Sequence, residues 1–139
     1  NNADIARELG MAPSAILERV KKLEQRGVIL QYNAKINPVA VGQNLLSFIF
    51  IKTNDIIGEQ AIGQFLADIP EVQEVHEIAG DDGYLIKVRT DDSTGLVNLM
   101  RNTFGKIEGI LSTRTTIVLD TVKEEQKLAI PSIDRNANE

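Results

Sequence analysis

The chain has 139 residues, of which 42% are hydrophobic, and it carries a formal net charge of −5. This length suits one medium-sized domain or two small ones with a buried core. With no cysteine and one histidine, the sequence argues against a disulfide framework, a thiolate metal site and a histidine-rich metal centre. It shows no secretory signal and no apolar run of membrane-spanning length, so we expect a cytoplasmic protein with no membrane partner.

Residues 1–30 have the pattern of two helices joined by a sharp turn. The first helix is predicted over residues 4–9, and Pro13 suits the first turn of the second helix, where its missing N–H costs little. Gly27 is expected to end that helix. An apolar seam at helical spacing is predicted to face the core, and it consists of Ile16, Val20 and Leu23.

A basic stripe runs along the second helix, about a quarter-turn from this seam. Residues 1–30 contain five basic and four acidic residues, so the acidic excess of the chain lies elsewhere. This layout is typical of a helix-turn-helix DNA reader, whose second helix enters the major groove of double-stranded DNA. The candidates for contacts with phosphates or base edges are Pro13, Ser14, Ala15, Arg19, Lys21, Lys22 and Arg26.

The remainder is predicted to be a hinge over residues 31–44, a domain over residues 45–128 and a tail over residues 129–139. The domain has the order βαββαβ, which is typical of an α+β, ferredoxin-like sandwich with both helices on one face of the sheet. Residues 128–131 are a candidate for an additional edge strand. The elements are expected at residues 45–53 (strand), 58–68 (helix), 72–79 and 84–90 (strands), 92–104 (helix) and 110–119 (strand).

The first and fourth strands are apolar on both faces, although one face of such a sheet is normally polar. We therefore predict that the open face packs on the same sheet of a second copy, which forms a twofold dimer. In the first strand, one face carries Leu45, Ile49 and Ile51, and the other carries Leu46, Phe48 and Phe50. In the fourth strand, one face carries Ile110 and Val118, and the other carries Leu111, Ile117 and Leu119.

The Gly80-Asp81-Asp82-Gly83 segment is a turn of the kind that closes hairpins. Two interpretations remain open: a plain hairpin turn, or an effector site. In the second, backbone N–H groups hold a carboxylate and Asp81 or Asp82 holds an ammonium group, which suits a free amino acid. Tyr84 belongs to the same candidate site, and Thr113 and Thr115 are weaker candidates that are equally consistent with ordinary strand threonines.

No nucleophile–base pair, phosphate-binding glycine loop or paired-carboxylate site stands out, so we expect neither an enzyme nor a cofactor. The leading hypothesis is a DNA-binding transcription regulator. The alternative is a stand-alone small-molecule-binding sandwich without DNA function, and the basic stripe argues against it.

The segment from Asp4 to Ile29, which includes Arg19-Val-Lys-Lys-Leu23, resembles the Lrp/AsnC family of feast/famine regulators. The resemblance continues in Asn37-Pro38, in Pro70-Glu71-Val72, in the hairpin of residues 80–88 and in residues 113–119. It implies a winged or three-helix DNA reader, an extended hinge and a βαββαβ effector domain. It also implies homodimers that often assemble into octamers, amino-acid effectors bound at or near contacts between dimers, and control of amino-acid metabolism genes.

The chain departs from the family pattern in four places. The first helix of the reader is missing, so we expect a partial helix-turn-helix domain. Ala12 occupies a position where the family usually has a capping serine, which weakens the helix start by about 1 kcal/mol. Glu18 stands where many members have a basic residue, and Gly83 where many have an aspartate, with Asp82 beside it.

Overall fold

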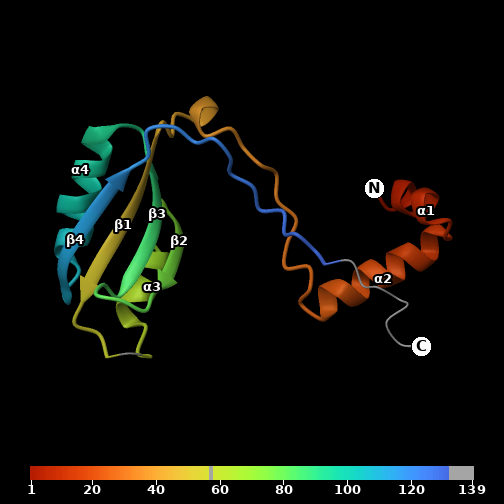
Figure 1. The fold of residues 1–139 in the computed structure, drawn as a ribbon, viewed down its shortest axis with the longest axis horizontal. Coiled ribbons are helices and arrows are strands. Elements are labelled where there is room, and N and C mark those ends of the chain that lie inside the picture. Colours follow the sequence, from red (N-terminus) through yellow and green to blue (C-terminus); the bar gives the residue numbers. More distant parts are fainter. Residues whose placement is uncertain (57, 132–139) are drawn as a thin grey trace. The chain divides into compact units, whose positions relative to one another are not determined.

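The structure is a computed structural model that describes residues 1–56 and 58–131. The chain divides into two compact units, Asn1–Asn37 and Pro38–Glu139. An extended segment connects the helices of the first unit to the sheet of the second (Figure 1). Each unit is described by itself.

The first unit contains two helices, α1 (Asn2–Leu9) and α2 (Pro13–Gln25). Helix α1 starts two residues before the predicted residue 4, because the Asn1 side chain accepts the N–H of Asp4 and the two residues form a capping box. Helix α2 starts without a side-chain cap at Ala12, as expected for alanine. It ends before Gly27, also as predicted.

The buried apolar surface of this unit is small. Among the residues of Asn1–Asn37, Ala6 and Ile16 are the buried hydrophobic side chains. Within the predicted seam, Val20 is half-buried and Leu23 is 39% exposed. The seam prediction is therefore confirmed at Ile16 and only partly realised at the other two positions.

Between the units the backbone is irregular from residue 30 to residue 37, and a short 3₁₀ helix, η1 (Val39–Val41), follows Pro38. The Tyr32 hydroxyl donates to Glu24 Oε1 at 2.8 Å, so the start of this segment is tied to the end of α2. The predicted hinge over residues 31–44 thus contains both the extended stretch and η1.

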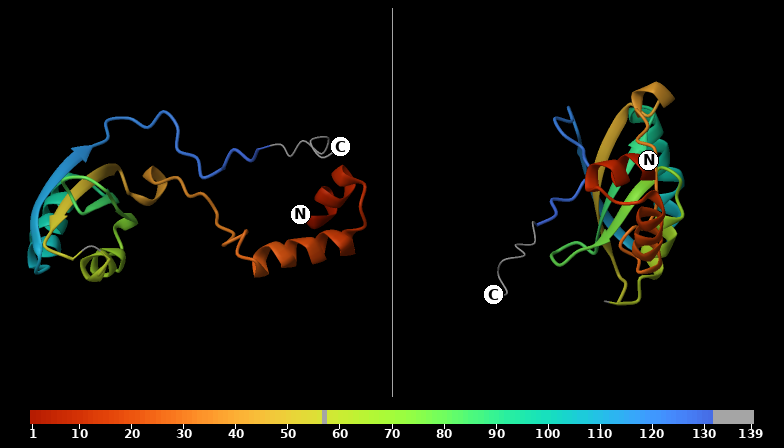
Figure 2. Two further views of the ribbon diagram at one scale, coloured as in Figure 1. Left: turned by 60° about the horizontal axis from the view of Figure 1, so that its bottom comes forward. Right: turned by 90° about the vertical axis from the view of Figure 1, so that its right-hand side faces the viewer.

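The second unit has the predicted βαββαβ order, and its strands form one antiparallel sheet in the order β2-β3-β1-β4. Helices α3 and α4 pack on the same face of this sheet (Figure 2). The elements are β1 (Leu45–Thr53), α3 (Ala61–Ala67), β2 (Val72–Glu77), β3 (Tyr84–Thr90), α4 (Ser93–Asn102), η2 (Phe104–Lys106) and β4 (Ile110–Ile117).

Several element ends differ from the prediction. Helix α3 begins three residues later than expected, because the N–H of Glu59 donates to the carbonyl of Ile56 and forms a turn before the helix. The helix predicted to end at residue 104 ends at Asn102 and continues as η2. Residues 128–131 do not form the predicted edge strand, and residues 132–139 of the predicted tail lie outside the described residues.

The core lies between the helix-covered face of the sheet and the two helices. Ile49 and Ile51 of β1 have no exposed surface, and neither has Leu66 of α3. A Cβ atom added at Gly63 of α3 would lie 2.9 Å from the ring of Tyr84, so the absence of a side chain there allows helix and sheet to pack closely.

The opposite face of the sheet, here called the outer face, combines apolar and charged side chains. Phe48 and Phe50 are half-buried on it, as the predicted alternation of β1 requires. The grouping expected for the fourth strand is wrong, because the register shifts between Lys52 and Thr53. Ile110 pairs with Thr53 and packs against the core, so it shares a face with Ile117 instead of opposing it. Ile117 pairs with the buried Ser47 and so shares the helix-covered face, whereas Arg114 lies on the outer face, 4.2 Å above the Phe50 ring.

The burial of β1 can be tested by replacing isoleucine with alanine at one buried and one exposed position. Ile49→Ala should lower the free energy of unfolding by about 2–5 kcal/mol, because it removes fully buried methylene and methyl groups. Ile56→Ala, at a side chain 68% exposed, should change it by no more than about 0.5 kcal/mol. Urea denaturation of both variants measures the difference, and equal losses would contradict this account of the core.

Candidate DNA interface and ligand-binding region

The basic stripe of α2 faces solvent. Arg19, Lys22 and Arg26 are exposed, and so is the neighbouring Lys21. At the start of the helix Pro13 and Ser14 are exposed, whereas Ala15 is half-buried. The structure therefore leaves the predicted DNA-contacting side chains accessible, with the two smallest of them, Ser14 and Ala15, at the N-terminal end of the helix.

One residue of the stripe has a partner within the helix. Lys22 Nζ lies 3.5 Å from Glu18 Oε1, and both side chains are more than half exposed. Ion pairs of this kind contribute roughly 0.3–0.5 kcal/mol, so a phosphate group can readily replace the glutamate. The departure at Glu18 thus reduces the positive field of the stripe without blocking Lys22.

The predicted effector turn is attached to the sheet by its backbone. The N–H of Gly83 donates to the carbonyl of Ile51 at 3.0 Å, and the N–H of Ile78 donates to the carbonyl of Gly83 at 3.0 Å. Gly80 and Asp81 are exposed at the tip of the turn, and Asp82 is half-buried. The turn is therefore held at its base and open at its tip.

The two aspartates of the turn have different surroundings. Asp82 Oδ2 accepts a hydrogen bond from Arg114 Nη2 at 3.1 Å, and the Asp82 side chain is 19% exposed. The Arg114 guanidinium also covers Phe50, so it links the turn to the outer face of the sheet. Asp81 is exposed and is the better placed of the two carboxylates to meet an ammonium group from solvent.

Tyr84 points into the protein rather than towards the tip of the turn. It is 3% exposed, and its hydroxyl donates to Asp55 Oδ2 at 3.0 Å. Burial raises the pKa of Tyr84 above its usual value, and the hydrogen bond to Asp55 raises it further. Tyr84 therefore fixes the position of Asp55, in the loop after β1.

Thr113 and Thr115 lie on a different face of the sheet from the Asp82–Arg114 pair. They pair with Ile51 and Ile49, whose side chains are on the helix-covered face. Thr115 Oγ1 contacts Met100 Sδ of α4 at 3.7 Å. Within one chain, the strand threonines and the Asp82 carboxylate are consequently separated by the sheet.

An ion-pair cluster on the outer face attaches the segment after β4 to β3. Glu124 lies 2.7 Å from Lys87 Nζ and 2.9 Å from Arg89 Nη2. The hydrogen bond from Lys87 lowers the pKa of Glu124, and one from His76 lowers the pKa of Glu74 on β2. Sequence reasoning missed this cluster, because its members are far apart in the chain.

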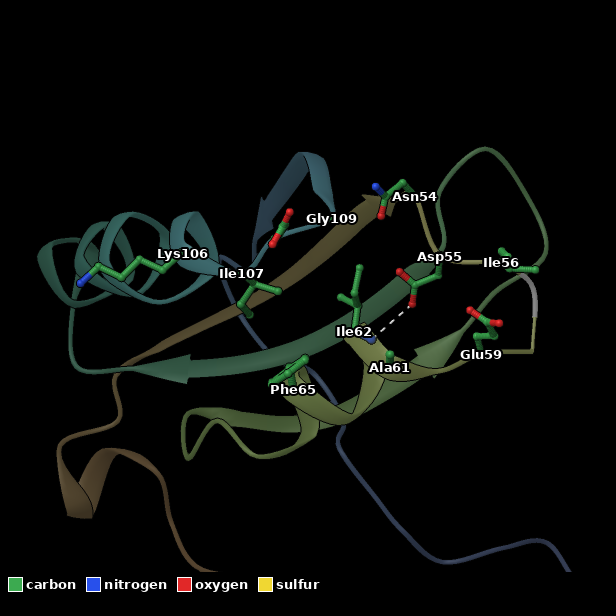
Figure 3. A pocket seen from close by; sticks show the side chains of 11 residues that line it. Asn54, Asp55, Ile56, Glu59, Ala61, Ile62, Phe65, Lys106, Ile107 and Gly109 are labelled. Atoms are coloured by element: carbon green, nitrogen blue, oxygen red, sulfur yellow. Dashed lines mark hydrogen bonds between the residues drawn. The ribbon is translucent and has the colours of Figure 1, made fainter.

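Sequence reasoning also missed a hollow of about 710 Å³ beside α3, which Figure 3 shows from close by. None of the predicted effector residues lines it. The described part of the chain contains no group of three or more His, Cys, Asp or Glu side chains placed to hold a metal ion. Within the same residues, no helix has the length and apolar character needed to cross a membrane.

Two known families match the chain, one in its N-terminal part and one in its C-terminal part. Residues 1–39 match a winged helix-turn-helix DNA-binding family, and residues 47–128 match the Lrp/AsnC ligand binding domain. The chain belongs to the Lrp/AsnC family. Its two parts are those of a DNA-binding transcription regulator with an attached ligand-binding domain, so the predicted family, fold and general function are confirmed.

Individual relatives extend over most of the chain. The HTH-type transcriptional regulator FL11 of Pyrococcus furiosus is 39% identical over 128 residues, which cover 91% of this chain and 83% of the relative. The leucine-responsive regulatory protein of Escherichia coli K12 is 32% identical, with coverages of 94% and 80%. The Rv3291c feast or famine regulatory protein from M. tuberculosis, solved in complex with L-methionine, superposes with a TM-score of 0.82 at 31% identity and covers 92% of this chain and 86% of that one.

The DNA-contacting role of Lys22 can be measured through salt dependence. Lys22→Ala should reduce the slope of log affinity against log salt concentration by about 1, because one phosphate contact and its released counterion are lost. Fluorescence anisotropy with a labelled duplex gives this slope. Lys123→Ala removes the same charge from the C-terminal unit and should leave the slope unchanged. An unaltered slope for Lys22→Ala would exclude the phosphate contact.

Proposed function

We propose that this protein is a non-enzymatic transcription regulator that reads DNA through α2 and senses a free amino acid through its C-terminal unit. The observation that carries the proposal is the match of both units to the two halves of a single regulator family. A relative of the same family binds L-methionine in its crystal structure, and another is named for its response to leucine. The curated relatives are named as regulators.

At the DNA surface, Arg19 and Lys22 supply charge for phosphates, and Arg26 extends the stripe towards the end of α2. Ser14 and Ala15 lie at the N-terminal end of the helix, which is the part of a recognition helix that meets base edges. Phosphate contacts set the register of the helix, whereas contacts to base edges select the sequence.

At the effector surface, the turn of residues 80–83 supports recognition of both charges of an amino acid. Asp81 is exposed and offers a carboxylate to the ammonium group. The backbone N–H of Gly83 is occupied by Ile51, so the amides nearer the tip are the donors for the carboxylate. Asp82 is paired with Arg114, which gives the turn a link to the outer face of the sheet.

The effector proposal predicts stabilisation by one or a few amino acids in a thermal-shift screen of the common set. A ligand that binds only the folded protein adds about 2.7 kcal/mol at a hundredfold excess over its dissociation constant. Asp81→Asn should weaken that binding by about fivefold, the value of one exposed ion pair. Asp120→Asn, at another exposed aspartate, should leave the shift unchanged. No shift with any amino acid, or an unchanged affinity in Asp81→Asn, would contradict the site.

We also propose that two copies pair through the outer faces of their sheets. Phe48 and Phe50 lie half-buried at the centre of this face, and Leu46, next to them on the same strand, is already buried within the single chain. Single exposed apolar residues are common on protein surfaces, but a row on a central strand is typical of an interface. A twofold pairing covers the same row in both copies. Assembly of such dimers into octamers stays a prediction from the family.

If two copies pair through their sheets, a charge placed on the outer face should disrupt the dimer, whereas the same charge placed elsewhere should not. Phe48→Asp should shift the sedimentation mass from dimer or higher oligomer to monomer, because a carboxylate would then be buried between two sheets. Phe65→Asp makes the same change on α3, on the opposite side of the unit, and should not disturb this pairing. Circular dichroism checks that both variants fold. A folded Phe48→Asp protein with the original mass would rule out the interface.

A further inference from the structure

The hollow beside α3 is formed by three segments that are distant in sequence. They are the loop after β1, the start of α3 and the residues between η2 and β4. Gly109 brings two of these walls together: it has a φ of +98°, its carbonyl accepts the N–H of Asn54, and an added Cβ would lie 2.6 Å from Ile62 Cδ1. A side chain at this position would strain the backbone, because of the positive φ, and would displace the ends of the Ile62 and Asn54 side chains.

The lining of the hollow combines an apolar floor with charged groups at its ends. In Figure 3, Ile107, Phe65 and Ile62 lie in the middle, Asp55 and Glu59 lie towards one end, and Lys106 lies towards the other. Glu108 adds a third carboxylate to the lining. A concave apolar surface with a few polar groups is the usual composition of a small-molecule site.

Asp55 provides the most specific observation. Its Oδ2 atom accepts hydrogen bonds from the Tyr84 hydroxyl at 3.0 Å and from the N–H of Ile62 at 3.3 Å. Its Oδ1 atom is buried and has no hydrogen-bond partner in the described part of the chain. Buried carboxylate oxygens are normally paired, so this unpaired atom can accept a bond from a donor that displaces the atoms covering it.

From this geometry we propose that the hollow is a second small-molecule site, which takes a ligand with a primary ammonium group on a short aliphatic chain. The ammonium group lies between Asp55 and Glu59 and donates to the carboxylates. The methylene groups cover Ile62, Phe65 and Ile107. Three carboxylates against one lysine give the lining a net negative charge, which favours a cation over an anion.

This site is distinct from the amino-acid site proposed at the turn of residues 80–83. No residue of that turn lines the hollow, and the hollow lies between α3 and the segment that precedes β4. The connection between the two is Tyr84, which follows the turn directly and donates to Asp55. Each site can therefore be tested without assuming the other.

The test uses pentylammonium chloride as the probe and 1-pentanol as its neutral counterpart of the same chain length. Both are titrated into the ¹⁵N-labelled protein while amide chemical shifts are recorded. Pentylammonium should cause saturable shifts at Ile62 and Gly109, and 1-pentanol should bind about tenfold more weakly, because it lacks the charge that the carboxylates recognise.

The matched variants change the charge of the lining and leave Asp55 intact, because Asp55 also accepts the hydrogen bond from Tyr84. Glu59→Gln combined with Glu108→Gln should weaken pentylammonium binding by about 25-fold, because the roughly fivefold effects of two exposed ion pairs multiply. Glu8→Gln combined with Glu125→Gln removes the same charge elsewhere and should leave the affinity unchanged.

The proposal would be overturned by the absence of a saturable shift at Ile62 or Gly109, by equal affinity for 1-pentanol, or by equal losses in the two double variants. Shifts confined to residues 80–83 would likewise overturn it, because they would place the cation at the turn. None of these results affects the amino-acid thermal shift or the DNA titration, so failure here is distinguishable from failure of the proposed function.

Discussion

Strand β1 lies at the centre of the sheet and fixes the arrangement of the second unit. This strand is hydrogen-bonded to β3 along one edge and to β4 along the other. Its two faces are both apolar, and the helices cover only one of them, where Ile49 and Ile51 are fully buried. A register shift of one residue would exchange the two faces, so the burial of these isoleucines fixes the pairing of both neighbours. The same strand therefore builds the core and leaves Phe48 and Phe50 on the outer face, where we propose that a second copy packs.

Residues at the end of β1 also form hydrogen bonds with other segments of the second unit. Gly83 donates to Ile51, Tyr84 donates to Asp55, and Asn54 donates to Gly109, so the turn before β3 and the residue before β4 are both attached to one strand end. The proposed amino-acid turn and the hollow beside α3 share this attachment. A ligand at either place would act on groups that the sheet already holds in position, which lowers the entropic cost of binding.

Much of this architecture was predictable, because periodicity and turn chemistry are local properties of the chain. The alternation in β1, the hairpin at residues 80–83 and the end of α2 before Gly27 all follow from a few neighbouring residues. The hollow and the ion pairs of Glu124 were not predictable in the same way, because only the tertiary fold brings their members together. The side of the sheet that Thr113 occupies depends on the register with β1, which the sequence pattern alone did not specify.

We propose that the chain joins DNA recognition to amino-acid sensing and that the two binding events are energetically linked. Linkage is reciprocal. If the amino acid changes the affinity for DNA by some factor, DNA changes the affinity for the amino acid by the same factor. The most direct measurement is the DNA affinity of the protein with and without a saturating concentration of the amino acid that stabilises it. We expect different DNA affinities in the two conditions, with a reciprocal change in amino-acid affinity when DNA is present. Identical DNA affinities at saturation would contradict it.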